Sequence, residues 1–344
     1  MCNRNLLFIR IVSYYHIRKS LRQQTNAITR SKSKQIFPSI HVCGRSWDAR
    51  AVNGLVSNGS IFKYLDSSDL VNMSSRLRLW AKRALVAAVS IVCVELGVLF
   101  YTTPRLPRAP GPVKGVVPGV QAENEEVEVE ENRPVQVLVF GDSVACGVGC
   151  PSNEAALAGA FSRNFCGLLA GRKVVWTVLA ESGYTADDMT KKLVPALLKR
   201  KNKVHFDVVL ISVGVNAVLS AHLPSTYREQ LIELLQSLRA AVGMKTAIVC
   251  MGMPPMHMFP QISYLKPLSW LVGWYASFCN EATHAACTET GEAVVVDVTI
   301  PRDASENPGM YMAPDGFHPN RKACDYFAAA MAIAAFKEMG VRSR

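Results

Sequence analysis

Hydrophobic and polar positions follow a regular pattern in the last two thirds of the chain. After Pro134, short runs rich in β-branched and other apolar residues alternate with longer stretches whose apolar positions have helical spacing. This alternation predicts parallel strands joined by crossover helices, with each strand buried on both faces. Strands are predicted at residues 135–140, 174–179, 206–213, 247–251 and 293–298. Helices are predicted at residues 154–169, 185–198, 225–242, 268–288 and 320–339.

These elements predict one α/β domain over residues 135–344. The expected architecture has three layers (α/β/α) around a five-stranded parallel, flavodoxin-like sheet. Such sheets commonly have the strand order 2-1-3-4-5, which brings together the carboxyl ends of the first three strands. Because ligands bind beyond those ends, the segments that leave the strands are where chemistry is expected.

An apolar run precedes this domain at residues 84–101. Its 18 residues are near the lower limit for crossing a bilayer, and they include Glu95. The apolar side chains outweigh the cost of this acidic residue, so the run is predicted to be a single transmembrane anchor. A buried or interfacial helix is the alternative. Basic residues are slightly more numerous before the run than after it, which favours a cytosolic amino end and a lumenal or extracellular domain beyond the anchor.

The segments on either side of this run are polar. Residues 1–80 are basic, and the first 47 residues hold nine Lys and Arg and no acidic residue. That composition is typical of an organelle transit peptide, with a disordered basic tail or a translation start at Met73 as alternatives. Residues 102–134 combine prolines with a run of glutamates and are predicted to be a linker.

Charge is distributed unevenly along the chain. Residues 1–120 carry 18 Lys and Arg against 4 Asp and Glu, so the remaining residues carry 20 against 23. The predicted domain is therefore slightly acidic, which argues against a nucleic-acid partner. The ten cysteines do not have the spacing of a zinc ribbon or a disulfide-stapled domain, and no metal or organic cofactor is predicted.

Residues of the types used in catalysis occur in the segments that follow the strands. Ser143 follows the first strand in a Gly-Asp-Ser sequence, Gly183 follows the second and Asn216 the third, while Asp315 and His318 precede the last helix. Each of them taken alone also fits a turn or a helix cap. Together they supply what nucleophilic catalysis needs: a serine, a histidine to take its proton, a carboxylate to orient that histidine, and donors for an oxyanion.

The combination Gly-Asp-Ser, Gly, Gly-x-Asn and Asp-x-x-His, in this order and on these elements, resembles the SGNH/GDSL hydrolase superfamily. The resemblance spans residues 135–339. It implies the SGNH hydrolase fold and an esterase or lipase in which Ser143 is the nucleophile, His318 the general base and acid, and Asp315 its orienting partner. It also implies an oxyanion hole formed by Ser143, Gly183 and Asn216.

Two positions depart from the family pattern. Val144 stands where Leu is usual, which is a small change of volume. Ala217 stands where the family usually has Asp after the Asn, so a carboxylate that would brace Asn216 is missing. This departure motivates the rival hypothesis of a catalytically inactive ligand-binding protein on the same fold.

The expected substrate is a lipid-like or medium-chain acyl ester, and the alternative is an acetylated carbohydrate. The expectation rests on the anchor and on residues 251–275, rich in Met and aromatic side chains, which form either core packing or an acyl-chain wall or membrane-facing lid.

Several cysteines lie near these segments. Cys146 and Cys150 are expected to be small buried hydrophobic residues. Cys279, His284 and Cys287 have poor spacing for a metal site on one helix.

Overall fold

The structure is a computed structural model that describes residues 67–119, 133–199, 205–299 and 307–342. It comprises two compact units, Met1–Arg78 and Leu79–Arg344. Most of the basic segment predicted at 1–80 lies outside the described residues, and so does the glutamate run at 123–131.

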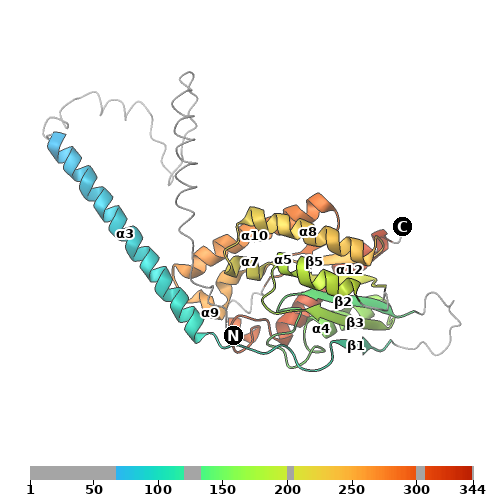
Figure 1. Ribbon diagram of the computed structural model, residues 1–344. Helices are drawn as coiled ribbons and strands as arrows, with labels where there is room; N and C mark the ends of the chain where they lie inside the picture. Colours follow the sequence, from blue (N-terminus) through green and yellow to red (C-terminus); the bar gives the residue numbers. More distant parts are fainter. Residues whose placement is uncertain (1–66, 120–132, 200–204, 300–306, 343–344) are drawn as a thin grey trace, which may run out of the picture. The chain divides into compact units, whose positions relative to one another are not determined.

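A six-stranded sheet forms the centre of the unit Leu79–Arg344 (Figure 1). Its strands are β1 (Lys114–Val117), β2 (Val135–Gly141), β3 (Val174–Ala180), β4 (Val208–Ser212), β5 (Ala247–Met251) and β6 (Val294–Val296). The spatial order is β1-β3-β2-β4-β5-β6, and every neighbouring pair except β1 and β3 is parallel. The predicted order of the five parallel strands is therefore confirmed, and the carboxyl ends of β3, β2 and β4 are neighbours.

Strand β1 corrects the prediction of a five-stranded, wholly parallel sheet. It lies within the predicted linker at 102–134 and pairs antiparallel with β3, with Lys114 opposite Thr177. A Cβ at Gly115 would overlap the Trp176 ring, so this glycine lets β1 lie close over the indole. The four residues of β1 are alternately exposed and half-buried and have no apolar alternation, which is why the pattern does not reveal the strand.

The chain just before β1 also lies against the domain. The Ala109 N–H donates to the carbonyl of Cys146 at 3.2 Å, and the Val178 N–H donates to the carbonyl of Val113 at 2.7 Å. The first part of the predicted linker therefore covers the loop after β2 and the edge of the sheet.

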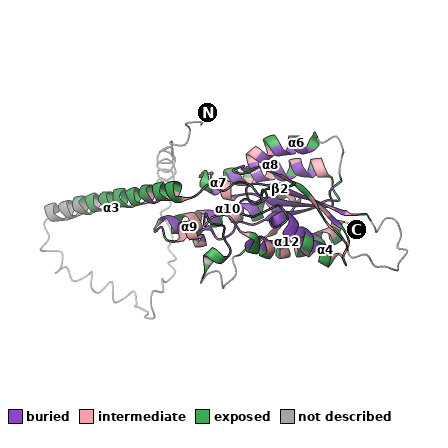
Figure 2. Ribbon diagram, turned by 90° about the horizontal axis from the view of Figure 1, so that it is seen from below, coloured by how far each residue is buried: buried purple, intermediate pink, exposed green. Residues whose placement is uncertain are grey.

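Helices cover both faces of the sheet (Figures 1 and 2). One face carries α4 (Leu157–Leu168) and α12 (Arg321–Arg342), and the other carries α8 (Pro224–Val242) and α10 (Leu268–Thr290). The predicted helix at 185–198 is divided into α5 (Ala186–Asp188), the π-helical turn Met189–Leu193 and α6 (Val194–Leu198). Shorter segments are α7 (Val215–Leu219), α9 (Pro260–Ser263) and the 3-10 turns Met256–Met258 and Pro308–Met310.

The core lies on both sides of the central strands. Every residue of β4 and β5 is buried, as expected of parallel strands covered by helices on each face. Each fully buried aliphatic side chain contributes about 1.5–3 kcal/mol. The rigid sheet thus fixes the loops at the amino and carboxyl ends of its strands.

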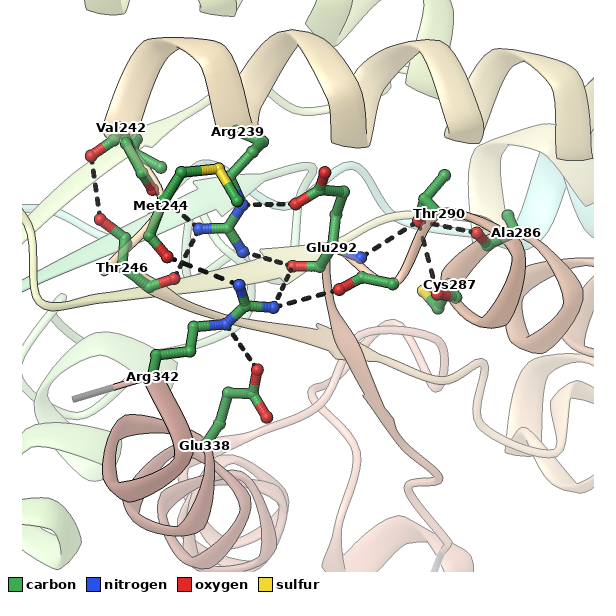
Figure 3. Close-up of polar contacts among 12 residues, drawn as sticks. Arg239, Val242, Met244, Thr246, Ala286, Cys287, Thr290, Glu292, Glu338 and Arg342 are labelled. Atoms are coloured by element: carbon green, nitrogen blue, oxygen red, sulfur yellow. Dashed lines mark hydrogen bonds and ion pairs between the residues drawn. The ribbon is translucent and has the colours of Figure 1, made fainter. Parts of the chain in front are cut away.

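A network of arginines and glutamates lies at the amino ends of β5 and β6 (Figure 3). Nε of Arg239 on α8 donates to Glu292 at 2.6 Å, and Nε of Arg342 on α12 donates to Glu338 at 2.6 Å. The other N–H groups of these two guanidinium groups donate to the backbone carbonyls of Gly243, Met244, Thr246, Gly291 and Glu292. These contacts join α8, α12 and the turn before β6.

Helix α3 (Ser67–Thr102) contains the apolar run predicted at 84–101. Its part Leu79–Thr102 has 24 residues and a mean hydropathy of 2.3, so this helix is long and apolar enough to cross a membrane. Figure 2 shows the described part of α3 as almost wholly exposed, although its side chains are mostly apolar.

Candidate active site

The turn before α12 holds Asp315 and His318 together. Oδ2 of Asp315 lies 2.5 Å from Nδ1 of His318, while Oδ1 accepts the backbone N–H groups of Phe317 and His318, both at 3.0 Å. Gly316 has φ +64° in this tight turn, a conformation that suits glycine. Asp315 is buried and the His318 side chain is 19% exposed. A proton on Nδ1 satisfies the carboxylate and leaves Nε2 as an acceptor.

The charge state of Asp315 supports this arrangement. Burial by itself raises the pKa of the carboxyl group, but the hydrogen bonds from the His318 ring and from the two backbone N–H groups lower the pKa below its usual 3.8. Asp315 is therefore ionised at neutral pH. An ionised carboxylate at Nδ1 fixes the tautomer of the ring and stabilises an imidazolium when Nε2 takes a proton.

Ser143 stands in the loop that leaves β2. The backbone of β2 approaches β4 closely here, because a Cβ at Gly141 would overlap the Ser212 carbonyl. Next, Asp142 accepts hydrogen bonds from Ser212 Oγ at 2.7 Å and from the Val144 N–H at 3.1 Å. The residues on both sides of Ser143 are thus fixed, and Ser143 itself is 9% exposed.

The loop after Ser143 lies against the turn that carries His318. A Cβ at Gly149 would meet the Cβ of His318 at 3.3 Å, and the pKa of Asp142 responds to the charge of His318. Across the described parts of the chain, no hydrogen bond occupies Ser143 Oγ or His318 Nε2. Both atoms are therefore free of protein partners among the described residues.

Gly183 and Asn216 follow β3 and β4, the two neighbours of β2. Gly183 has φ +85°, and no atom lies within 4 Å of the position that a Cβ would take, so the backbone there faces open space. The Asn216 side-chain nitrogen donates to the carbonyl of Tyr184 at 3.0 Å. An amide group has a second N–H, which stays available. Asn216 is thus braced from the Gly183 loop, in the absence of a carboxylate at Ala217.

The carboxyl group of Asp142 titrates unusually. Burial raises its pKa from 3.8 to about 6, although the hydrogen bonds from Ser212 and Val144 and the charge of His318 act in the opposite direction. Asp142 is therefore a buried group that supports the loop and is close to titration near neutral pH.

Cys146, Cys279, His284 and Cys287 have the following surroundings. Burial raises the pKa of Cys146 to about 11, so this thiol stays neutral and behaves as a small hydrophobic residue. Cys279 and Cys287 are buried in the core, whereas His284 bonds Asp297 at 2.9 Å. In the part of the chain that the structure describes, no three potential ligands gather around one point.

Residues 251–275 divide into two parts. The first part supports the turn that carries Asp315 and His318: the rings of Phe259 and Phe317 pack edge to face at 5.3 Å, and the Gln261 N–H donates to the Gly316 carbonyl at 3.2 Å. Core packing therefore describes this part. The second part begins α10 and exposes Trp270 and Trp274.

Two features of the site escape the sequence pattern. Ser212 holds Asp142, and its only signal is a hydroxyl at the carboxyl end of an apolar strand. A cleft of about 320 Å³ lies beside the Asp315 turn, between the proline-rich segment 106–110, residues 149–151 and Pro314. The proline content of the first of these segments is typical of linkers and gives no signal of a cleft wall.

The fold and these loops define the class of SGNH hydrolases. The profile of the GDSL-like lipase/acylhydrolase family matches residues 139–325, more than half of the chain, and the chain belongs to this family. It is a carboxylic ester hydrolase.

Solved structures resemble the chain at low sequence identity. TesA has 20% identity, covers 59% of this chain and 99% of its own, and has a TM-score of 0.43. A member of the lipolytic protein G-D-S-L family from Veillonella parvula has 14% identity, covers 59% and 98%, and has a TM-score of 0.44. A carbohydrate esterase family 3 protein from Talaromyces cellulolyticus has 17% identity, covers 60% and 99%, and has a TM-score of 0.43. A comparison with curated proteins finds no match.

Proposed function

We propose that this ester hydrolase acts through Ser143 as nucleophile, His318 as general base and acid, and Asp315 as the carboxylate that orients His318. The main support is the 2.5 Å contact between Asp315 and His318, in a turn that lies against the loop of Ser143. The lowered pKa of Asp315 and the free Nε2 atom fit these roles.

In the acylation step, Ser143 Oγ attacks the ester carbonyl carbon while Nε2 of His318 takes the hydroxyl proton. The carbonyl oxygen gains negative charge and is bound by the N–H groups of Ser143 and Gly183 and by the second N–H of Asn216. His318 then gives its proton to the departing alkoxide, and the alcohol leaves. Next, His318 takes a proton from water, which attacks the acyl-enzyme. The carboxylic acid departs and Ser143 regains its proton.

The proposed substrate is a lipid-like or medium-chain acyl ester. The open space above Gly183 leaves room for an acyl group against the backbone. The exposed apolar helix α3 and the exposed aromatic residues of α10 suit a protein that works beside lipid.

We also infer that α3 is a single-pass anchor, with the catalytic domain on the side opposite the cytosol. Its apolar side chains are exposed, and basic residues flank its amino end more densely than its carboxyl end. Alkaline extraction of membranes followed by protease protection tests this directly: the domain should stay with the membrane and be shielded from cytosolic protease.

The experiment that tests the activity is hydrolysis of a p-nitrophenyl ester series from acetyl to palmitoyl by the full-length protein in mild detergent. Ser143→Ala serves as the control. We expect a Ser143-dependent optimum at a medium or long acyl chain. An optimum at acetyl would move the substrate to acetylated carbohydrates, and full activity of Ser143→Ala would remove Ser143 from the mechanism.

A further inference from the structure

The first three turns of α10 carry large apolar side chains on the outside of the domain. Trp270, Leu271, Trp274 and Phe278 are 64%, 47%, 64% and 37% exposed, and we call them the α10 aromatic face. The spacing of these residues places them on one side of the helix. No charged residue occurs between positions 268 and 278. Water is a poor environment for such a surface, and a contiguous apolar patch of this kind marks an interaction site.

Helix α3 contacts the domain at the start of α10. The backbone N–H of Leu268, the first residue of α10, donates to Glu95 Oε2 at 2.9 Å, and the Gln261 side chain donates to Thr102 Oγ1 at 2.9 Å. Glu95 is 9% exposed although its neighbours along α3 are exposed, and Leu99, one turn on, packs against the core. One face of α3 is thus bound to the domain, and the acidic residue within the apolar run has a specific partner.

The position of Glu95 sets the depth of this contact. Glu95 lies six residues before Tyr101, the end of the apolar run. At 1.5 Å per residue the contact therefore lies roughly 9 Å inside the end of the run. Interfacial helices bury their apolar faces about 5–10 Å into the boundary between headgroups and acyl chains. With α3 as the anchor proposed above and the end of its apolar run at the membrane surface, the amino end of α10 lies at the depth of an interfacial helix.

We propose that the α10 aromatic face is inserted into the surface of the same bilayer that α3 crosses. Trp side chains favour the boundary between water and lipid, and this face carries two of them. The Lys266 ammonium donates to Ser269 Oγ at 2.7 Å and lies 5.5 Å from the centre of the Trp270 ring, so a positive charge stands beside this face as is common at membrane interfaces. The bilayer thereby covers the exposed apolar surface, and Glu95 fixes the angle between anchor and domain.

This docking has a consequence for substrate access. The segment before α10 also supports the catalytic turn, through Phe259 against Phe317 and through the Gln261 N–H to the Gly316 carbonyl. Insertion of the α10 aromatic face therefore holds the turn that carries His318 close to the lipid surface. An ester in the membrane then reaches the site without crossing bulk water. The inference rests on the proposed anchor, and its test does not need catalysis.

The test uses Trp fluorescence of the full-length protein reconstituted into phosphatidylcholine vesicles. Lipids brominated near the headgroup end of their acyl chains quench indoles at that depth, whereas iodide quenches indoles in water. The variant Trp270→Phe/Trp274→Phe keeps an aromatic surface, so the emission it loses relative to the wild type belongs to Trp270 and Trp274. We expect this difference emission to be quenched by the brominated lipid and shielded from iodide.

Two results would overturn the proposal, and they differ from each other. Protein that stays on the vesicles after an alkaline wash but whose difference emission is quenched only by iodide would refute the docking and spare the anchor. Protein that the wash removes would refute both. Neither result depends on hydrolysis, so a failure of the proposed activity is seen separately with Ser143→Ala.

Two further variants examine the link through Glu95. Glu95→Gln keeps an oxygen that accepts the Leu268 N–H, whereas Glu95→Leu removes it. We expect the Gln variant to retain the bromine quenching of the difference emission, measured against the same Trp-to-Phe pair, and the Leu variant to lose a large part of it. Equal quenching in both variants would contradict the role of Glu95. The exposed pair Ile333 and Phe336 on α12, changed together to Gln, is the matched control and should leave the quenching unchanged.

Discussion

Ionic groups lie both at the amino ends of the strands and near their carboxyl ends, and the two sets of groups have different roles. At the amino ends of the strands, Arg239 and Arg342 donate all their described hydrogen bonds to glutamates and to backbone carbonyls (Figure 3). Near the carboxyl ends, Asp315 likewise accepts hydrogen bonds from three donors, but its partner His318 keeps one ring nitrogen unbound within the described residues.

The difference shows how a fold separates stability from reactivity. A buried ionic group whose partners are all satisfied rigidifies its surroundings. A chain of contacts that ends on an unbound acceptor directs that acceptor instead. The comparison predicts that changes at Arg239 and Arg342 alter the free energy of unfolding, whereas a change at His318 alters the rate.

The largest effect is expected from His318→Gln. Gln is close to His in size, and the backbone N–H groups of residues 317 and 318 still donate to Asp315, but Gln has no basic nitrogen that could take a proton from Ser143. We expect kcat to fall by about 10⁴-fold or more, while the midpoint of thermal unfolding stays close to that of the wild type. Ester hydrolysis and a thermal melt on the same preparation measure both. A variant with near-normal kcat would show that His318 is not the base.

The opposite result is expected from Arg239→Met. The Arg239 side chain is 4% exposed and donates four hydrogen bonds, so its removal takes this donor from the Glu292 carboxylate and from the carbonyls of Gly243 and Thr246, while the Glu292 carbonyl keeps Arg342. We expect the free energy of unfolding to drop by about 3–5 kcal/mol, with kcat of the folded enzyme unchanged. Chemical denaturation measures the loss. Arg228→Met is the matched control, because its ion pair with Glu289 is exposed and is expected to contribute less than about 1 kcal/mol.

A pH-dependent effect is expected from Asp142→Asn. The folded pKa of Asp142 is about 6 and lies above the unfolded value of 3.8, so between these pH values the folded state holds a proton that the unfolded state has released. The contribution of this carboxyl to stability is therefore present at low pH and is lost as pH rises to about 6. The full change is on the order of 3 kcal/mol.

Denaturation of both proteins at a series of pH values tests this prediction. The wild type should lose stability relative to Asp142→Asn between about pH 4 and 6, and the difference should level off above that range. A constant difference over the whole range would show that Asp142 is not a buried carboxyl with a raised pKa.

The smallest effect on rate is expected from Ala217→Asp, which restores the residue usual in the family. Ala217 is buried, and Asn216 is already braced by the Tyr184 carbonyl. The new carboxylate gains little and costs about 1–3 kcal/mol of stability for burying a polar group. We expect kcat within about a factor of two of the wild type. A large rise in kcat would show that Asn216 is poorly oriented in the natural protein.

The parallel sheet and the placement of the loops that carry the candidate site residues could be predicted from the sequence pattern, for a physical reason. Strands buried on both faces are continuous apolar runs, and the known order of such sheets then places the loops of Ser143, Gly183 and Asn216 side by side. Strand β1 could not be predicted from the sequence pattern, because the position of this short edge strand is set by the space above the Trp176 ring. The brace of Asn216 does not follow either, since a backbone carbonyl can be supplied by any residue at position 184.

The most direct measurement of the central claim is covalent capture of the nucleophile by a fluorophosphonate, read by peptide mass spectrometry on the full-length protein. The account predicts one modified residue, Ser143, with labelling strongly slowed in His318→Gln and unchanged in rate in Arg228→Met. Folded wild-type protein that takes no label, or that takes it at another residue, would contradict the account.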